Sequence, residues 1–342
     1  MGRNRVLVTT SWLAEEDHVH RMLTGAGHDV VFGRPADLAH RGWSLADVVK
    51  DADAIIAGVE PCDARVLNTA SRLKVVARTG VGHDNVDVAT ATALGVAVCA
   101  TPGVNRLSVA EFTIAALLNL VRHVPELGAA VQRGEWPQAG GRELHGKTLG
   151  VIGLGTIGRS VAELARAFGM TVLAHDPHVG SALAGVPLVE LPELLARADA
   201  VTVHVFLDDS TRHLINARAL SLMKPGAVLV NAARGGVVDE SALVGALHSG
   251  ALAGAALDTF EHEPLPADSP LRGVANLLLT PHVAGATVEG RLRSGTSAAE
   301  SVLAALSGEI PPAAVNGRAI AHHARLKARN AAPPTETARP SR

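Results

Sequence analysis

The stretch LGVIGLGTIGR, residues 149–159, constrains the fold of this 342-residue chain more than any other feature. An apolar run ends there in Gly153, Gly155 and Gly158, spaced G-x-G-x-x-G, and the helical pattern RSVAELARAFG follows. Between a strand and a helix, the first glycine permits a tight turn, the second lets a phosphate approach the backbone, and the third allows close packing. The free N–H groups at the helix start then favour an anion. The stretch therefore predicts the strand–turn–helix unit of a dinucleotide-binding fold.

Short apolar runs recur on both sides of this turn, with helical patterns between them. They are almost entirely apolar rather than alternating, which is typical of parallel strands covered on both faces. The runs are residues 6–8, 54–57, 75–77, 96–98, 149–152, 171–173, 200–203, 228–230, 255–257 and 277–279. Strand–helix alternation along the whole chain predicts an α/β protein with doubly wound, Rossmann-like parallel sheets.

Composition narrows the class of protein further. Hydrophobic residues make up 47% and charged residues 19%, which is typical of a folded chain, and the net charge of −2 favours neither a nucleic acid nor a membrane as partner. Cys62 and Cys99 belong to no metal-binding pattern, so we expect two reduced, buried thiols and no metal site. We find no apolar leader and no run of about 18 apolar residues, so we expect a cytoplasmic location.

The strand series divides near residue 100. The segment 100–124 starts with a Pro-Gly turn and continues as a helix that is apolar over much of its surface, so we expect it to be buried between domains or subunits. A second helical stretch, 285–308, follows the last apolar run. We predict one domain formed from both chain ends, residues 1–101 and 285–318, and a dinucleotide-binding domain, residues 102–284. Residues 319–342 lose periodicity and predict a mobile tail.

The strand after the glycine turn ends in Asp176, 18 residues beyond Gly158. A carboxylate at about this distance accepts hydrogen bonds from the adenosine ribose and repels a 2′-phosphate. The pattern therefore predicts NAD rather than NADP as the cofactor. His175 and His178 flank Asp176 and could soften this discrimination.

Three later strand ends carry residues suited to carbonyl reduction. Hydride transfer to a carbonyl needs a cation to bind and polarise the substrate and an acid to protonate the new alkoxide. Arg234 in VNAARGGVVDE supplies a cation, and His282 in TPHVAG supplies an acid. Glu263 in ALDTFEHEP would fix the imidazole tautomer and stabilise the protonated ring. Each residue alone is more typical of a surface or cap, so the prediction rests on the set; His262 is the nearest rival of His282.

As an ordered set, the motifs resemble those of the D-isomer-specific 2-hydroxyacid dehydrogenases, in particular the phosphoglycerate dehydrogenase-like branch. The resemblance covers about residues 50–310. The motifs are RTGVGHDNVD, ATPGVNRLSVAE, GEW, LHGKTLGVIGLGTIGR, HDP, VNAARGGVVDE, ALDTFEHEP and TPHVAGAT. The resemblance implies NAD as cofactor, a substrate domain built from both chain ends, a Rossmann-type cofactor domain and a homodimer formed across the cofactor domains.

The resemblance also implies individual roles. Arg234 would bind the substrate carboxylate and carbonyl, His282 would be the acid/base, and Glu263 would orient His282. Val81 and Gly82 would offer backbone N–H groups to the carboxylate. The cofactor contacts that it implies are Gly153, Gly155, Thr156, Ile157, Gly158, Asp176, Val205, Ala232, Asp258 and Gly285.

Several positions depart from the family pattern. Phe206, in HVFLDD, stands where the family usually has a proline on the nicotinamide side. Gly58 stands where some phosphoglycerate dehydrogenases carry an arginine for the substrate phosphate. Arg78 and Arg106 are then the candidates for binding a distal anion of the substrate, although Arg106 could equally just start a helix. No regulatory domain is expected after residue 318.

These observations favour an enzyme that reduces a small 2-oxo acid with NADH or runs the reverse. We expect a substrate with a second anion, such as 3-phosphohydroxypyruvate (the oxidised form of 3-phosphoglycerate) or phosphonopyruvate; hydroxypyruvate and glyoxylate are the alternatives. Glu263 counts against the formate dehydrogenase branch, which uses a glutamine as the partner of its histidine. An NAD-sensing binding protein like the C-terminal-binding corepressors, which share fold and catalytic residues, is an alternative of another class.

Overall fold

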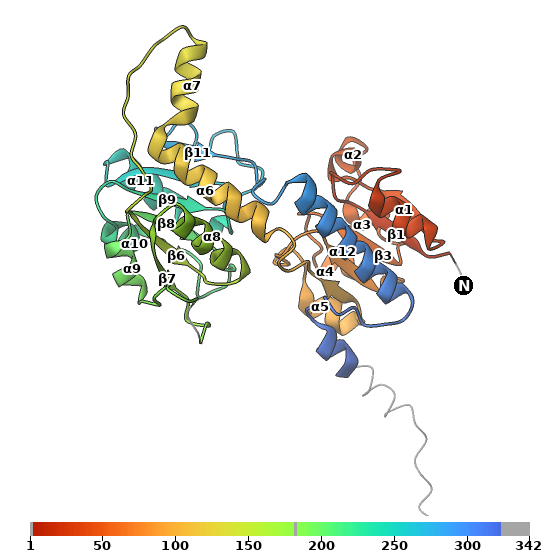
Figure 1. Cartoon of the computed structure of the whole chain (residues 1–342). Helices are drawn as coiled ribbons and strands as arrows, with labels where there is room; N and C mark the ends of the chain where they lie inside the picture. Colours follow the sequence, from red (N-terminus) through yellow and green to blue (C-terminus); the bar gives the residue numbers. More distant parts are fainter. Residues whose placement is uncertain (1–2, 181–182, 323–342) are drawn as a thin grey trace, which may run out of the picture. The chain divides into compact units, whose positions relative to one another are not determined.

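The computed structural model describes residues 3–180 and 183–322, which fall into two compact units (Figure 1). The first unit is Met1–Val104 with Arg291–Arg342, and the second is Asn105–Gly290. The boundaries predicted from the sequence, at residues 101 and 284, lie 3 and 6 residues before those in the structure. Of the predicted tail, residues 319–322 are helical, and residues 323–342 lie outside the described part of the chain.

The first unit contains a five-stranded parallel sheet in the order β2-β1-β3-β4-β5. Its strands are β1 (Arg5–Val8), β2 (Asp29–Phe32), β3 (Ala54–Ala57), β4 (Val75–Arg78) and β5 (Ala97–Cys99). The sequence interpretation missed β2. This strand lies at the sheet edge and has no fully buried residue, although residues 30–32 form an apolar run as long as residues 6–8 of β1.

Helices cover both faces of this sheet. They are α1 (His18–Gly25), α2 (Pro35–His40), α3 (Leu45–Val48), α4 (Ala64–Thr69), α5 (Val88–Leu94) and α12 (Val288–Leu306), of which residues 291–306 belong to this unit. Asp17, Asp63 and Asp87 start α1, α4 and α5 by accepting the N–H three residues on. Alternate strand residues pack into two separate core clusters, so each face of the sheet is buried.

The second unit contains a six-stranded parallel sheet in the order β11-β10-β9-β8-β6-β7. Its strands are β6 (Thr148–Ile152), β7 (Thr171–His175), β8 (Ala200–Val203), β9 (Ala227–Asn231), β10 (Leu252–Leu257) and β11 (Leu277–Leu279). Its helices are α6 (Arg106–Arg122), α7 (Val124–Gln132), α8 (Thr156–Ala167), α9 (Leu191–Arg197), α10 (Ala217–Leu222) and α11 (Glu240–His248), with a 3-10 turn η1 (Gly235–Val237). The α/β class and the two doubly wound parallel sheets are confirmed.

The apolar helix α6 is buried within the second unit itself. It packs on α8, β9 and β10, and its residues join the core around β6. The chain then turns by 62° at His123, and α7 stands out from the sheet of this unit (Figure 1). Among the described residues, no single helix has the length and apolar character of a membrane span; α6 and α7 reach them only together, as a bent pair.

The two cysteines are buried and unpaired, as predicted. Burial raises the pKa of Cys62 to about 12 and that of Cys99 to about 11. Both thiols are therefore protonated and inert at neutral pH.

Candidate active site

Three neighbouring strands of the second unit end beside one another. Because β9, β10 and β11 are parallel and adjacent, their carboxyl ends lie at one edge of the sheet. Arg234 follows β9, Glu263 lies in the loop after β10, and His282 follows β11. Arg234, Glu263 and His282, which span 48 positions of the sequence, are thereby carried on three adjacent strand ends.

Glu263 and His282 form the central contact of this edge. Nδ1 of His282 lies 2.7 Å from Oε2 of Glu263. Because a carboxylate can only accept, Nδ1 carries the proton and Nε2 is left for another partner. The Phe260 N–H donates to Oε1 of Glu263 at 3.0 Å and fixes the carboxylate in turn. The His282 side chain remains 36% exposed, so the ring is oriented but accessible.

The electrostatic environment keeps Glu263 ionised. Burial raises its pKa, but the hydrogen bond and charge of His282, the Phe260 N–H and the charge of Arg234 together outweigh burial and hold the pKa below its usual value. The carboxylate can therefore stabilise a protonated His282 at neutral pH. The positive charge of Arg234, on the adjacent strand end, contributes to this effect.

Asp258 organises the loop that carries His282. Its side chain is 1% exposed. Oδ1 accepts the Thr280 hydroxyl at 2.6 Å and the Val283 N–H at 2.9 Å, and Oδ2 accepts the Ala284 N–H at 2.8 Å. Its main-chain oxygen accepts the N–H of His282, which has a left-handed φ of 54°. Nothing in the sequence signals this positioning role, since the partners are mostly main-chain groups; a contact of Asp258 with the dinucleotide stays a prediction.

The R-G-G sequence after β9 is explained by close packing. A Cβ atom on Gly235 would lie 1.9 Å from the carbonyl carbon of Phe260, so only glycine lets this turn press against the loop that carries Glu263. The Arg234 carbonyl accepts the Asn231 side-chain amide at 2.8 Å. Arg234 itself is partly buried, and its Nη1 donates to the Ala233 carbonyl at 2.8 Å.

The glycine turn after β6 has the geometry of a phosphate cradle. Gly153 has φ +91°, and a Cβ on Gly158 would lie 2.0 Å from the Gly153 oxygen, so the protein itself requires both glycines. A Cβ on Gly155 would instead meet nothing within 4 Å. Open space therefore faces the N-terminus of α8, where Thr156 and Ile157 form the first turn. These residues fit a bound pyrophosphate.

Asp176 lies beside this turn. It follows β7, the neighbour of β6, and its Oδ2 accepts the Leu154 N–H from within the glycine turn at 2.8 Å. The His178 N–H donates to Oδ1 at 2.9 Å. The carboxylate is partly exposed, which suits it to accept further bonds from a ribose diol.

The remaining predicted cofactor contacts lie on loops of the second unit. Val205 and Ala232 follow β8 and β9, and a Cβ on Gly153 would come within 2.9 Å of the Val205 side chain. Gly285 follows the His282 loop, with Asn105 directly against it. His204, left out of the predicted site, also ends β8; burial lowers its pKa to about 4, and its Nε2 is buried with no hydrogen-bond partner among the described residues.

The predicted substrate contacts are divided between the units. Arg78 ends β4 in the first unit and is 6% exposed; its Nε donates to the Gly82 carbonyl at 3.1 Å. It thereby supports the loop that contains Val81 and Gly82. Arg106 is the first, exposed residue of α6 in the second unit. The structure thus gives Arg78 a role in holding a loop, and binding of a distal anion stays a prediction for both arginines.

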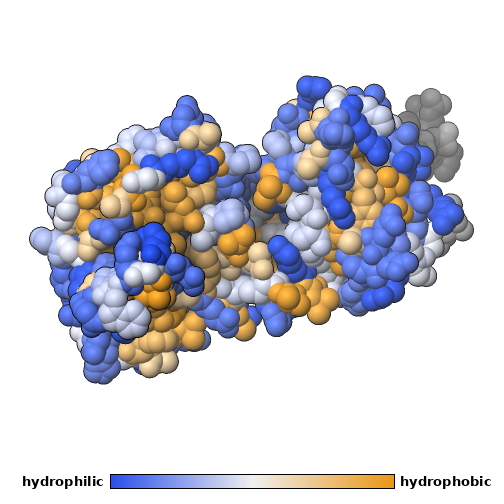
Figure 2. Space-filling model, turned by 90° about the horizontal axis from the view of Figure 1, so that it is seen from above, coloured by the Kyte–Doolittle hydropathy of each residue, from blue (hydrophilic) through white to orange (hydrophobic). Residues whose placement is uncertain are grey.

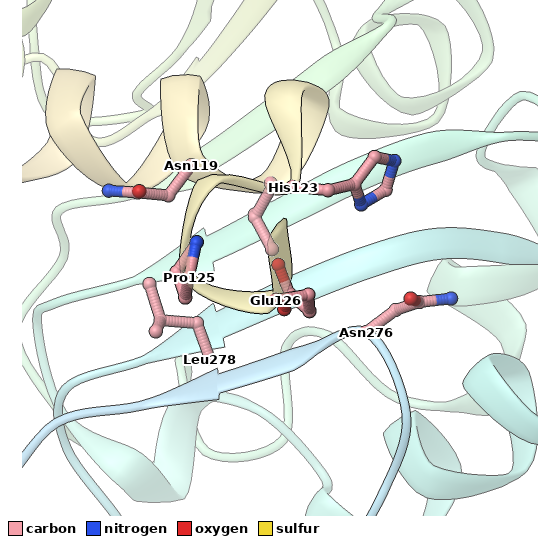
Figure 3. Close-up of a pocket in the computed structure, with 7 residues that line it drawn as sticks. Asn119, His123, Pro125, Glu126, Asn276 and Leu278 are labelled. Carbon is pink, nitrogen blue, oxygen red and sulfur yellow. The ribbon is translucent and has the colours of Figure 1, made fainter. Parts of the chain in front are cut away.

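Two further features lie outside the catalytic set. Phe206 follows β8 and is 66% exposed, with its carbonyl held by the Thr211 hydroxyl at 2.6 Å. A pocket between the α6–α7 turn and β11 is lined by Asn119, Leu120, His123, Pro125, Glu126, Asn276 and Leu278 (Figure 3). Because Asn276 precedes β11, this pocket lies at the amino edge of the sheet, opposite to His282. Within the described residues, no group of three or more His, Cys, Asp or Glu side chains is placed to hold a metal ion.

Comparison with known proteins adds the family. Residues 114–284 match the D-isomer specific 2-hydroxyacid dehydrogenase family in its NAD binding domain. D-3-phosphoglycerate dehydrogenase of Methanocaldococcus jannaschii is 44% identical over 80% of this chain and 53% of its own, so the chain spans about half the length of that relative. Glyoxylate reductase of Thermofilum pendens is 40% identical over 84% of this chain and 88% of its own. The TT0316 protein of Thermus thermophilus superposes with a TM-score of 0.83 at 39% identity, over 91% and 99% of the two chains.

Proposed function

Because this chain belongs to the D-isomer-specific 2-hydroxyacid dehydrogenase family and has its NAD-binding domain, we propose that it is an NAD-dependent oxidoreductase that interconverts a small 2-oxo acid and a D-2-hydroxy acid. The observation that carries the proposal is the Glu263–His282 contact of 2.7 Å, with Arg234 on the adjacent strand end of the same sheet. An open glycine turn suited to a dinucleotide lies on that sheet as well.

The proposed chemistry divides among these residues. NADH, which the glycine turn and Asp176 would hold, would supply the hydride for the carbonyl carbon of the 2-oxo acid. The guanidinium of Arg234 binds the carboxylate and draws electron density toward the carbonyl oxygen. As the C=O double bond becomes a single bond, Nε2 of His282 gives its proton to that oxygen. Glu263 keeps the other ring nitrogen protonated and balances the charge of the imidazolium before transfer. Oxidation of the hydroxy acid is the reverse of these steps.

Asp176 supports a preference for NAD over NADP. Its carboxylate lies against the glycine turn, where the adenosine ribose of a bound dinucleotide belongs. A 2′-phosphate there would meet a like charge. We therefore propose NADH as the reductant.

The family alone does not specify the 2-oxo acid, and we propose two classes of substrate. Phosphoglycerate dehydrogenases act on a substrate with a second anion, and the sequence offered Arg78 and Arg106 to bind such a group. The glyoxylate reductase relative is named for a substrate without one. Hydroxypyruvate, like glyoxylate, has no second anion. In both classes, the backbone N–H groups of Val81 and Gly82 are proposed to hold the carboxylate common to all.

A homodimer is proposed from the surface of the second unit. Val124 and Val131 on α7 are 55% and 49% exposed, and Trp136, just beyond α7, is 78% exposed. From above, on the side where Figure 1 shows α7, the second unit carries apolar areas among hydrophilic ones (Figure 2). Exposed apolar side chains on a projecting helix are typical of a subunit interface.

The test is NADH oxidation, followed by absorbance, against a panel of 2-oxo acids with NADPH as the comparison. We expect turnover with NADH, and loss of turnover with unchanged NADH binding in His282→Asn. Tight NADH binding by the wild-type protein without turnover of any acid would contradict the proposal. That result would favour the NAD-sensing binding protein instead.

A further inference from the structure

The sheet of the first unit has its own topological switch point. Its order β2-β1-β3-β4-β5 runs one way from β1 to β2 and the other way from β3 to β5. In open α/β sheets, ligands bind outside the carboxyl ends of the strands at such a point. Here that place lies between β1, which is followed by Thr9 and Thr10, and β3, which is followed by Gly58 and Glu60.

Glu60 is held in a fixed position at this switch point. Its Oε1 accepts the hydroxyl of Thr9, directly after β1, and the N–H of Gly58 at 2.9 Å. Its main-chain oxygen accepts the Asn85 side-chain amide at 2.6 Å. Both hydrogen bonds of the carboxylate go to Oε1, so within the described chain Oε2 has no donor, and the side chain is only partly buried. The carboxylate is therefore a preorganised acceptor for a bound molecule.

The neighbouring side chains at this edge are two threonine hydroxyls and two arginines that already have partners. The hydroxyls of Thr10 and Thr79 lie 3.0 Å apart, and both are neutral. Arg78 is buried and donates to main-chain oxygens. Arg34, which follows β2, donates to the Leu13 carbonyl and lies over the Phe32 ring. A dianionic phosphate placed against Oε2 of Glu60 would therefore meet a like charge at contact distance.

Gly58 and Glu60 act as a pair. A Cβ atom on Gly58 would lie 2.8 Å from Oε2 of Glu60, so any side chain at position 58 displaces this carboxylate. An arginine at position 58, the residue that some phosphoglycerate dehydrogenases use for the substrate phosphate, would require the Glu60 side chain to move from the position it has here. The glycine thus makes room for the carboxylate as well as removing the cation.

We infer that Glu60 determines substrate specificity, and that the substrate group farthest from its carboxylate is a hydrogen-bond donor, a hydroxyl or a cation, rather than a phosphate or phosphonate. The inference rests on the proposed function, because Val81 and Gly82, proposed to hold the carboxylate, follow β4, which pairs directly with β3. It reverses the sequence-based expectation of a second anion. Hydroxypyruvate is the smallest 2-oxo acid that meets the requirement.

The experiment compares kcat/KM for four acids in the wild-type protein, Glu60→Gln and Glu60→Asp. Glyoxylate has no distal group, hydroxypyruvate has a hydroxyl, 2-oxo-5-guanidinopentanoate has a cation and 3-phosphohydroxypyruvate has a dianion. We expect the wild-type protein to favour hydroxypyruvate, the cation or both over the phosphorylated acid by at least about ten-fold. Glu60→Gln should reduce that ratio by about ten-fold and leave glyoxylate within about three-fold. Glu60→Asp, which keeps the charge, should continue to disfavour the phosphorylated acid.

Glu300→Gln is the matched control, since it removes an exposed carboxylate from α12 of the same unit and should leave all ratios unchanged. Thermal unfolding and NADH binding establish that each variant is folded. Wild-type preference for 3-phosphohydroxypyruvate, or an unchanged ratio in Glu60→Gln, would overturn the inference while turnover of glyoxylate upheld the proposed function. Turnover of none of the four acids by the wild-type protein would refute the proposed function and the inference with it.

Discussion

Replacing Asp258 by asparagine tests the role that the structure gives this residue. The carboxylate is almost completely buried and accepts three hydrogen bonds, from Thr280, Val283 and Ala284. An asparagine can keep its oxygen toward the first two donors, but its NH2 group then faces the Ala284 N–H. Two donors meet where a donor and an acceptor met before, so the loop on either side of His282 loses one of its anchors.

The magnitude follows from these three bonds. A hydrogen bond to a charged group contributes about 1.5–3 kcal/mol and a neutral one about 1 kcal/mol. In Asp258→Asn, one hydrogen bond to a charged group is lost and two others become hydrogen bonds to a neutral group. Burying a neutral amide costs less than burying a carboxylate, which offsets part of this loss. The net destabilisation is then about 3 kcal/mol. For a unit the size of Asn105–Gly290, this corresponds to a fall of roughly 6–12 °C in Tm. Misplacement of His282 by about 1 Å should lower kcat by about 100-fold.

The assay combines thermal unfolding by circular dichroism, NADH binding and steady-state turnover. Asp239→Asn is the matched control: Asp239 caps α11 through the Ala242 N–H, and asparagine caps helices equally well, so its Tm should change by less than about 2 °C. If Asp258→Asn keeps both the Tm and kcat of the wild-type protein, the argument that Asp258 positions His282 is wrong. A loss of NADH binding alone would assign Asp258 to the cofactor instead.

Three further predictions test other parts of the structure. Gly155→Ala should fold normally but weaken NADH binding by at least about ten-fold, because the new Cβ would occupy the open space proposed for a phosphate. Gly158→Ala should unfold, because its Cβ would clash with the backbone. Equal NADH affinity of Gly155→Ala and the wild-type protein would refute the phosphate site. Glu263→Gln should lower kcat for reduction by about 10–100-fold and move the high-pH fall of activity to lower pH, because the protonated form of His282 loses its charged partner; an unchanged pH profile would contradict this. Val131→Glu should convert the proposed dimer to a monomer in light scattering, and an unchanged mass would exclude α7 from the interface.

The sequence predicted those features that depend on contacts local in the chain. The strand runs were visible because a parallel strand covered on both faces is apolar throughout. The glycine turn was predictable because the close approach of Gly158 to the Gly153 oxygen lies within one strand–turn–helix unit. The strand order β11-β10-β9 could not be predicted from the sequence. Arg234, Glu263 and His282 could still be grouped, because each comes after a predicted strand and parallel strands have their carboxyl ends at one edge.

Features that depend on distant contacts were not predictable. The strand β2 was missed although residues 30–32 are apolar, and its place at the sheet edge is set by its pairing with β1. Asp258 has the same sequence signal whether it contacts a dinucleotide, a loop or both, and its three donors from residues 280–284 became visible only in the structure. Arg78 was a candidate for binding a distal anion because Gly58 stands where some phosphoglycerate dehydrogenases carry an arginine, and that role stays a prediction. The structure shows its guanidinium donating to the loop itself.

Glu60 shows why substrate specificity is harder to predict than catalysis. The catalytic residues must perform the same proton and charge transfers on every substrate of the family, so their types and local motifs are restricted. A specificity residue needs only to match one distal group, and its effect depends on neighbours such as Thr9, which is 51 residues away in the chain but shares a hydrogen bond with Glu60. The absence of an arginine at Gly58 was visible in the sequence. The structure, in which β1 and β3 pair side by side, shows that the Glu60 carboxylate fills this space. By the inference above, the site then repels a phosphate instead of merely lacking an attraction for it.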